Sequence, residues 1–324
     1  MKPRNIAFCI IVFAAAAAVF SSRPASAWLP EKYGGTATIR LHSKMSKIDP
    51  ILATRPDEFT VVFAVFEPLL YRNSGGGVSP LLLEEMPQKS GDGLTYSFRL
   101  KDGVTFHDGT TLDTADVLFS FQRLVKSTRS AYSWILDGIK GTTNFRTGRA
   151  RDIEGFKIID AQSFEITLVK PNPNFLRLLA FPAACIVSNT NNSFNPPIGS
   201  GQFKFTSVKA NGTITLSAFD GHRNGRPYID TAKFVVVKSD DDAVVEFRTS
   251  GLTITDTPPD GLRSEDKSGK VSITAGNMKT FFILDINPGS GSGFPPASRS
   301  LRLLMVGDSI GSGGGGSILN AGST

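Results

Sequence analysis

The stretch GLTYSFRLKDGVTFHDGTTLDTADVLFSFQRL (residues 93–124) predicts a strand, a turn and a helix in immediate succession. Apolar and polar residues alternate over 94–101, as in a half-buried strand. Asp108-Gly109 supplies a turn, because glycine tolerates positive φ and aspartate bonds nearby amides. Asp113 is placed as the N-cap of the helix and Asp116 as its N3 residue. The helix then presents one apolar face, made of Val117, Leu118, Phe121, Leu124 and Val125.

His107 is the residue of this stretch that invites a chemical interpretation, because three aspartates follow it closely. A metal site would need further ligands at a spacing such as HxxxH, and the other histidines, His42 and His222, stand isolated in the sequence. General acid/base catalysis would need a nucleophile or a partner carboxylate within reach, and the sequence shows none. We therefore interpret His107 as structural, and we expect no catalytic residue, metal site or cofactor.

Strands and helices flank this stretch without a strict alternation. We predict strands over 34–43 and 228–238, hairpins over 155–171 and 201–219, and helices over 57–72, 171–182 and 240–251. Pro68 should end or kink the first of these helices. Asn211-Gly212 in the second hairpin predicts a type I′ turn, in which both central residues have positive φ. The mixture predicts an α/β chain of mixed α+β type.

The first 27 residues have the composition of a secretory signal peptide. They begin with the basic Lys2 and Arg4, continue with an apolar run from Ile6 to Phe20, and end in Ala25-Ser26-Ala27. The run is short for a membrane-spanning helix, and the ending resembles an A-x-A cleavage site. We therefore expect cleavage before Trp28 and export of the chain.

The remaining residues are ordinary in composition and only mildly basic. Loss of Lys2, Arg4 and Arg23 lowers the net charge from +6 to +3, and no block of Lys and Arg remains, which argues against nucleic-acid binding. Cys185 is then the only cysteine, so an intramolecular disulfide and a cysteine zinc site are excluded. Its neighbours in LLAFPAACIVS are apolar, which predicts a buried, unreactive thiol.

The segments DGLTYSFRL, DGVTFHDG and TADVLFSFQR occur in the order typical of one known family. Three further stretches agree with that family: KIDPILATRPDEFTVVFAVFEPLLY (47–71), NPPIGSGQFKF (195–205) and GRPYIDTAKFVVV (225–237). The chain resembles the family 5 extracellular solute-binding proteins, the peptide-, dipeptide- and nickel-binding receptors of ABC importers. The resemblance runs from about residue 34 to residue 287, although Ser200 and Gln202 replace the commoner Thr and Pro of one loop.

The resemblance implies a periplasmic-binding-protein-like type II clamshell of two lobes that holds its ligand between them. It implies a monomer in the periplasm that binds an oligopeptide or related small solute and delivers it to ABC permease subunits in the inner membrane. The family lines its cleft with loops that correspond to two segments here. On that basis the candidate ligand contacts are Ser43, Lys44 and Met45 after the first strand, and Ser200 in the later loop.

The end of the sequence departs from the family pattern. From Pro288 onward the chain is rich in Gly and Ser, which is typical of a linker or a disordered tail. We expect a signal peptide over 1–27, the first lobe over 28–276, and over 277–324 an aborted crossover with a disordered tail, so that most of the second lobe is missing. An intact second-lobe reading frame in the DNA after codon 324 would support truncation or a frameshift, and its absence within a few hundred bases would contradict it.

Two other functions remain open at this point. One is a non-functional remnant of such a receptor. The other is a GDS-type serine esterase with Ser309 in MVGDSIGSG (305–313) as nucleophile, although no His or Asp follows that serine to complete a catalytic site. The sequence leaves the ligand undecided among peptide, nickel chelate, haem and other small solutes.

Overall fold

The computed structural model describes residues 33–73, 76–191, 194–249 and 251–255, and the backbone of two strands at 272–275 and 282–285. The predicted signal peptide, the Gly/Ser-rich tail from Pro288 and the serine at 309 lie outside the described residues. Within the described part, no helix has the length and apolar character needed to cross a bilayer.

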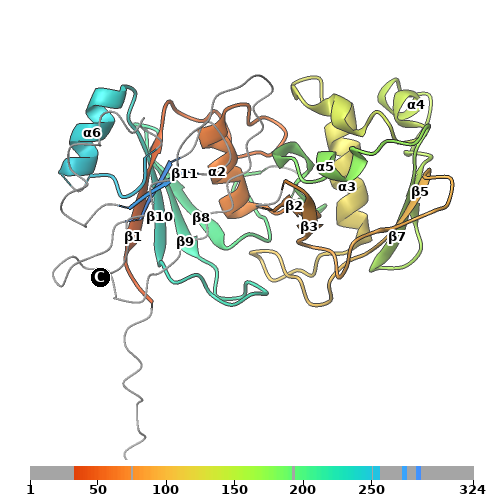
Figure 1. Ribbon diagram of the computed structural model, residues 1–324, viewed down its shortest axis with the longest axis horizontal. Helices are drawn as coiled ribbons and strands as arrows, with labels where there is room; N and C mark the ends of the chain where they lie inside the picture. The colour runs from red at the N-terminus through yellow and green to blue at the C-terminus, as the bar shows by residue number, and fades with distance from the viewer. Residues whose placement is uncertain are drawn as a thin grey trace, which may run out of the picture. The chain divides into compact units, whose positions relative to one another are not determined.

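A four-stranded mixed sheet has the strand order β1-β10-β9-β8. Strands β1 and β10 run parallel, and the other two pairs are antiparallel. Helix α2 packs against β1 and β8 (Figure 1), and its apolar residues join those of the sheet in one buried cluster. The bounds are β1 Thr36–Leu41, β10 Thr231–Val236, β9 Ile214–Ala218, β8 Phe203–Val208 and α2 Pro56–Val65.

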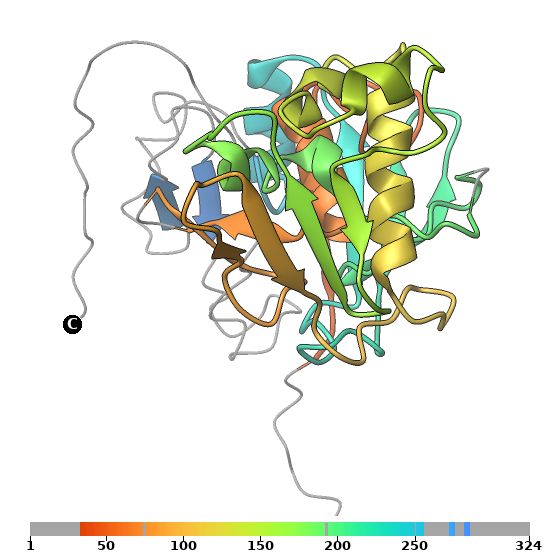
Figure 2. The ribbon, with the colours of Figure 1, turned by 90° about the vertical axis from the view of Figure 1, so that its right-hand side faces the viewer.

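A second four-stranded sheet, with the order β4-β5-β7-β6, is antiparallel throughout. Its bounds are β4 Gln88–Lys89, β5 Thr95–Arg99, β7 Ser163–Thr167 and β6 Phe156–Ile158, and α3 spans Thr114–Lys126. Phe164 stacks between Phe98 and Phe156, with ring centroids 4.7 Å and 5.0 Å away, and the edge of Phe121 from α3 meets Phe156 at 5.9 Å. Aromatic packing therefore joins α3 to this sheet, and Figure 2 shows the helix beside the strands.

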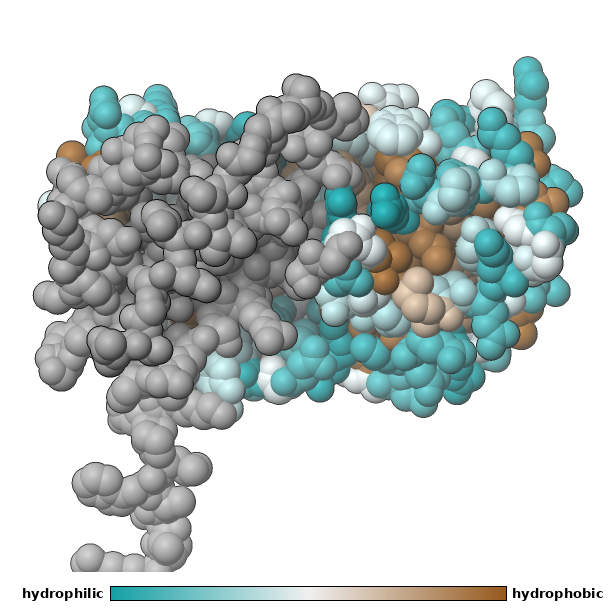
Figure 3. All heavy atoms as spheres, in the orientation of Figure 1, coloured by the Kyte–Doolittle hydropathy of each residue, from teal (hydrophilic) through white to brown (hydrophobic). Residues whose placement is uncertain are grey.

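Shorter elements complete the described chain. They are the β2–β3 hairpin (Leu70–Arg72 and Val78–Pro80), η1 Ser133–Leu136, α4 Thr142–Arg146, α5 Phe175–Leu178, η2 Pro182–Ala184, α6 Asp240–Arg248, and the pair β11 Ser272–Ala275 and β12 Phe282–Asp285. Hydrophilic side chains dominate the visible rim of the part that carries α3, α4 and β5, and apolar ones show between them (Figure 3).

The predicted start of α3 is confirmed. The Asp113 carboxylate accepts hydrogen bonds from the amides of Ala115 at 2.8 Å and Asp116 at 3.3 Å, and Asp116 in turn accepts one from the Asp113 amide at 3.0 Å. Both acids thus satisfy amides that have no partner within the helix. Gly109, with φ of 87°, forms the predicted turn together with the Asp108 carboxylate, which accepts from the Thr110 amide at 3.0 Å.

Asp113→Ala is expected to lower the free energy of unfolding by about 1 kcal/mol, because two amides of the first turn of α3 lose their acceptor. Urea denaturation of the full chain measures the change. Asp102→Ala is the matched control, since Asp102 is an exposed aspartate outside any helix, and its effect should stay within about 0.5 kcal/mol. Equal effects of the two changes would contradict the capping role.

One local prediction is wrong. Asn211 does not have positive φ, so the β8–β9 turn is not type I′. Gly212 alone takes the left-handed conformation, at φ 90°, and follows a turn closed by its amide on the Lys209 carbonyl at 2.8 Å. The helix predicted within 57–72 forms and ends at Val65, shortly before Pro68 as expected. Glu67 precedes that proline, a position that disfavours helical geometry, and it pairs with Ile186 as a β-bridge.

Candidate functional site

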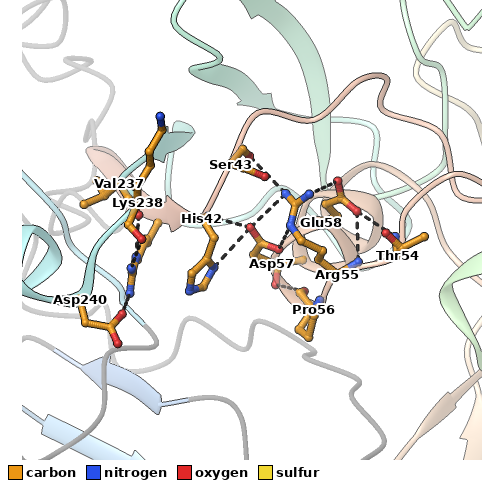
Figure 4. A network of polar contacts seen from close by, with 12 residues as sticks. His42, Ser43, Thr54, Arg55, Pro56, Asp57, Glu58, Val237, Lys238 and Asp240 are labelled. Atoms are coloured by element: carbon orange, nitrogen blue, oxygen red, sulfur yellow. Dashed lines mark hydrogen bonds and ion pairs between the residues drawn. The ribbon is translucent and has the colours of Figure 1, made fainter.

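The loop that leaves β1 is fastened to the first turn of α2 by a set of ionic contacts (Figure 4). The buried Asp57 carboxylate accepts from the His42 amide at 2.8 Å and from Arg55 Nε at 3.1 Å. Arg55 also donates to the Ser43 carbonyl at 3.2 Å and contacts Glu58 at 2.8 Å. These contacts fix the backbone of the loop after β1.

A second set of contacts fastens β1 to the junction of β10 and α6. The Arg40 guanidinium is buried, and it donates to the Val237 carbonyl at 2.9 Å and to Asp240 Oδ1 at 2.6 Å (Figure 4). Ser239 caps α6 by accepting from the Asp242 amide at 3.1 Å. Since β1 and β10 are parallel, the loops at their carboxyl ends lie at the same edge of the sheet.

A cavity of about 730 Å³ opens at this edge. Its walls come from the loop after β1, the β8–β9 turn, the end of β10 and helix α6. The lining residues are Ser43, Lys44, Asn211, Val236, Val237, Lys238, Asp242, Val245 and Glu246. Two cations, two anions and an apolar strip of valines therefore line one concavity. The carboxyl ends of strands are the usual ligand position in open α/β sheets, and the volume suits a small organic ligand.

Two of the four predicted contact residues, Ser43 and Lys44, lie at this cavity. The Lys44 ammonium donates to the Ala210 carbonyl at 2.7 Å, which holds its side chain along the β8–β9 turn. Met45 is half-buried against the core of the first sheet. The lining residues from β10 and α6 were not predicted from the sequence, because they join Ser43 and Lys44 only through the pairing of β1 with β10.

Ser200 lies elsewhere, in the interior. It is 1% exposed, and its hydroxyl donates to Glu67 Oε2 at 3.0 Å. Gly199 and Gly201 flank it with no room for side chains, since a Cβ at either would lie 2.0 Å or 2.5 Å from a carbonyl oxygen of α2. The Ser200 side chain therefore faces Glu67.

Glu67 is the centre of a buried polar cluster that the sequence did not predict. It accepts from Arg223 and Ser200, and His222 Nε2 lies 3.4 Å from its Oε1. Burial alone would raise the pKa of Glu67, but hydrogen bonds from His222 and Arg223 and the charge of Arg223 outweigh it and lower that pKa. The cluster joins the α2–β2 connection to the segments around residues 200 and 222.

His107 takes a structural position, as interpreted from the sequence. Its Nε2 bonds to the Gly201 carbonyl at 2.9 Å, its Nδ1 accepts from the Gly199 amide at 3.3 Å, and its ring edge meets Phe219. Burial lowers the pKa of His107 to about 4, so the ring is neutral at pH 7. Among residues of the described ranges, no three His, Cys, Asp or Glu side chains gather as metal ligands would. Cys185 is buried as predicted, and burial raises its pKa.

Comparison with known proteins agrees with this architecture. A model of the bacterial extracellular solute-binding proteins, family 5 (middle), matches residues 77–302. The chain is 26% identical over 275 residues to the periplasmic murein peptide-binding protein MppA of Escherichia coli, which covers 80% of this chain and 50% of that protein. It is 28% identical over 280 residues to the periplasmic oligopeptide-binding protein OppA of Salmonella typhimurium, with 82% and 47% covered.

Solved structures show the same fold. The unliganded open form of the E. coli murein tripeptide-binding protein MppA superposes with a TM-score of 0.66 at 23% identity, over 74% of this chain and 49% of that one. The Bacillus subtilis oligopeptide-binding protein AppA, in complex with a nonapeptide, gives 0.64 at 20% identity, over 75% and 48%. The chain spans about half the length of the curated relatives it matches, and its fold corresponds to about half of the periplasmic-binding-protein architecture. Because the family model matches more than half of the chain, the chain belongs to the bacterial extracellular solute-binding proteins of family 5, a family of binding proteins rather than enzymes.

Proposed function

We propose that the chain binds an oligopeptide or a related small solute in the periplasm and delivers it to the permease subunits of an ABC importer. Family membership is the observation that carries this proposal. Two of the similar proteins, MppA and OppA, are named for the peptides they bind. The predicted signal peptide over 1–27 supports the periplasmic location.

The cavity at the end of β1 and β10 is the proposed ligand position. A free peptide carries an ammonium group at one end and a carboxylate at the other, and the lining offers Lys44 and Lys238 for the anion and Asp242 and Glu246 for the cation. The valines would face the apolar parts of the peptide. Ser43, Lys44 and Met45 remain our candidates for direct contact, whereas Ser200 would act only by holding its loop on Glu67.

A peptide that binds only the folded chain should raise its melting temperature. At a concentration of about 100 times Kd, binding stabilises the folded state by about 2.7 kcal/mol, which corresponds to roughly 5 °C or more in a chain of this size. Pools of di-, tri- and oligopeptides are tested on protein recovered from the periplasmic fraction.

Export itself is tested by N-terminal sequencing of the recovered protein. The sequence should begin at Trp28.

The lining residues are tested with single changes. Lys238→Gln is expected to weaken binding of the active pool by about 1.5 kcal/mol, roughly tenfold in Kd, because it removes a charged partner. Lys89→Gln, on the exposed edge strand β4 of the other sheet, is the matched control and should leave Kd unchanged. If the cavity does not bind the peptide, both variants should have the same Kd. If no peptide pool raises the melting temperature, the chain is better explained as a non-functional remnant than as a receptor.

A further inference from the structure

The positive charge of the chain is concentrated in one segment. Residues 126–154 contain six cations and three acids, an excess of three. Residues 28–324 as a whole also carry a net charge of +3, because Lys2, Arg4 and Arg23 account for the other half of +6. The rest of residues 28–324 is therefore neutral in sum.

The structure packs the elements of this segment against one another. It comprises the end of α3, η1, α4 and the loop that follows, and α4 lies against α3 (Figure 2). Arg146 Nε donates to the Val125 carbonyl at 3.1 Å, and its Nη2 donates to the Ser133 carbonyl at 3.4 Å, which brings α4 beside both α3 and η1. The Lys126 ammonium lies 4.2 Å from the ring centroid of Phe145 in α4. We call the exposed part of this segment the basic face; its members are Lys126, Arg129, Trp134, Arg146, Arg149 and Arg151.

The acids of the segment are already engaged. Asp137 pairs with Arg146, Glu154 lies 2.6 Å from the Lys140 ammonium, and Asp152 accepts from Gln122 at 3.0 Å. By contrast, the exposed side chains of Arg129, Arg149 and Arg151 have no hydrogen bond or ion pair within the part of the chain that the structure describes. These three guanidinium groups are therefore available to bind anionic groups of another molecule.

Two large apolar side chains are exposed in this segment or next to it. Trp134 is 56% exposed on η1, and Val169 is 65% exposed. The Val169 amide bonds to the Gly138 carbonyl at 2.9 Å, so this residue lies next to the η1–α4 connection. A soluble polyanion would use the arginines but not the tryptophan. Tryptophan, however, favours the headgroup region of a bilayer, where its ring is half in apolar and half in polar surroundings.

We propose that the basic face docks the protein on an anionic phospholipid surface, with the three free arginines on lipid phosphates and Trp134 in the headgroup region. Juxtaposed basic residues and an interfacial tryptophan are the two components that peripheral membrane binding combines. The proposal is independent of the proposed ligand cavity, which lies at the edge of the other sheet and shares no residue with the basic face.

Vesicle sedimentation of the purified full chain tests this. We expect binding to phosphatidylcholine vesicles that contain about 30% phosphatidylglycerol at about 0.15 M salt, loss of binding at 1 M salt, and little binding to phosphatidylcholine alone. The triple change Arg129→Gln/Arg149→Gln/Arg151→Gln should weaken binding on the order of 100-fold, about fivefold for each cation. Trp134→Ser should weaken it several-fold.

The matched control removes the same charge elsewhere. Lys89→Gln/Lys157→Gln/Lys209→Gln changes three exposed lysines outside the basic face and should leave binding nearly intact. Circular dichroism confirms that each variant is folded. Equal loss in both triple variants, or no binding to the anionic vesicles, would overturn the proposal. So would equal affinity for soluble polyglutamate together with no effect of Trp134→Ser, since that pattern indicates attraction to any polyanion.

Discussion

Replacing Glu67 by alanine is expected to lower the free energy of unfolding by about 3 to 5 kcal/mol, the usual cost of removing one member of a buried ion pair. The change would leave the buried guanidinium of Arg223 without its counter-ion, and it would remove the acceptor of the Ser200 hydroxyl. Arg223 already has two nitrogens, Nε and Nη2, that are buried without a hydrogen-bond partner among the described residues. Loss of the Glu67 carboxylate is therefore not easily compensated by the described residues around Arg223.

Urea denaturation of the full chain measures this loss, and Glu84→Ala provides the matched control. Glu84 also pairs with an arginine, Arg99, at 2.7 Å, but both side chains are more than half exposed. That surface pair should contribute less than about 1 kcal/mol. The double variant Glu67→Leu/Arg223→Leu should lose less than the sum of the single changes, because no lone buried charge remains. If Glu67→Ala costs no more than Glu84→Ala, the cluster does not stabilise the fold.

The sequence predicted those parts of the molecule whose causes lie within a few residues. Asp113 and Asp116 were placed correctly because acceptors at the N-cap and N3 positions are favoured at a helix start. The hairpin over 155–171 forms because strands of alternating pattern flank a short turn. The type I′ turn predicted at Asn211-Gly212 was wrong, because Gly212 alone supplies the positive φ that this turn needs. Short-range sequence patterns therefore predict where a helix, strand or turn occurs, but they do not always predict its backbone geometry.

The polar cluster and the cavity were beyond such rules. Glu67 lies 133 residues from Ser200 and 155 from His222, so no spacing in the sequence connects them. Ser200 illustrates the limit: the resemblance placed its loop at the cleft, but the close approach of Gly199 and Gly201 to α2 turns the side chain inward. Ser43 and Lys44 were predicted as ligand contacts from the family resemblance. Lys238, Asp242 and Glu246 could not be predicted, because they line the cavity only as a result of the parallel pairing of β1 with β10.

Acidification from pH 6.5 to pH 4 is expected to remove about 2 to 3 kcal/mol of stability through His107 alone. Burial lowers the pKa of this ring from 6.5 to about 4 in the folded chain. The nearby Lys204 and His222 also lower this pKa, whereas Glu67 and the hydrogen bond to the Gly201 carbonyl raise it. The unfolded chain therefore binds the proton first. The contribution is fully present above pH 6.5, falls as the pH decreases through this window, and does not fall further once the folded ring is also protonated.

The comparison of the full chain with His107→Gln isolates this effect. Glutamine can still donate to the Gly201 carbonyl but does not titrate, so the variant should lose stability less steeply between pH 6.5 and pH 4. Urea midpoints at half-unit pH intervals give both curves, and an NMR titration of the His107 ring should report a pKa near 4. Identical slopes for the two proteins, or a ring that titrates near 6.5, would show that burial does not hold His107 neutral. Both observations would then reopen the chemical interpretation of this histidine, because a ring that protonates near neutral pH would be available to accept a proton.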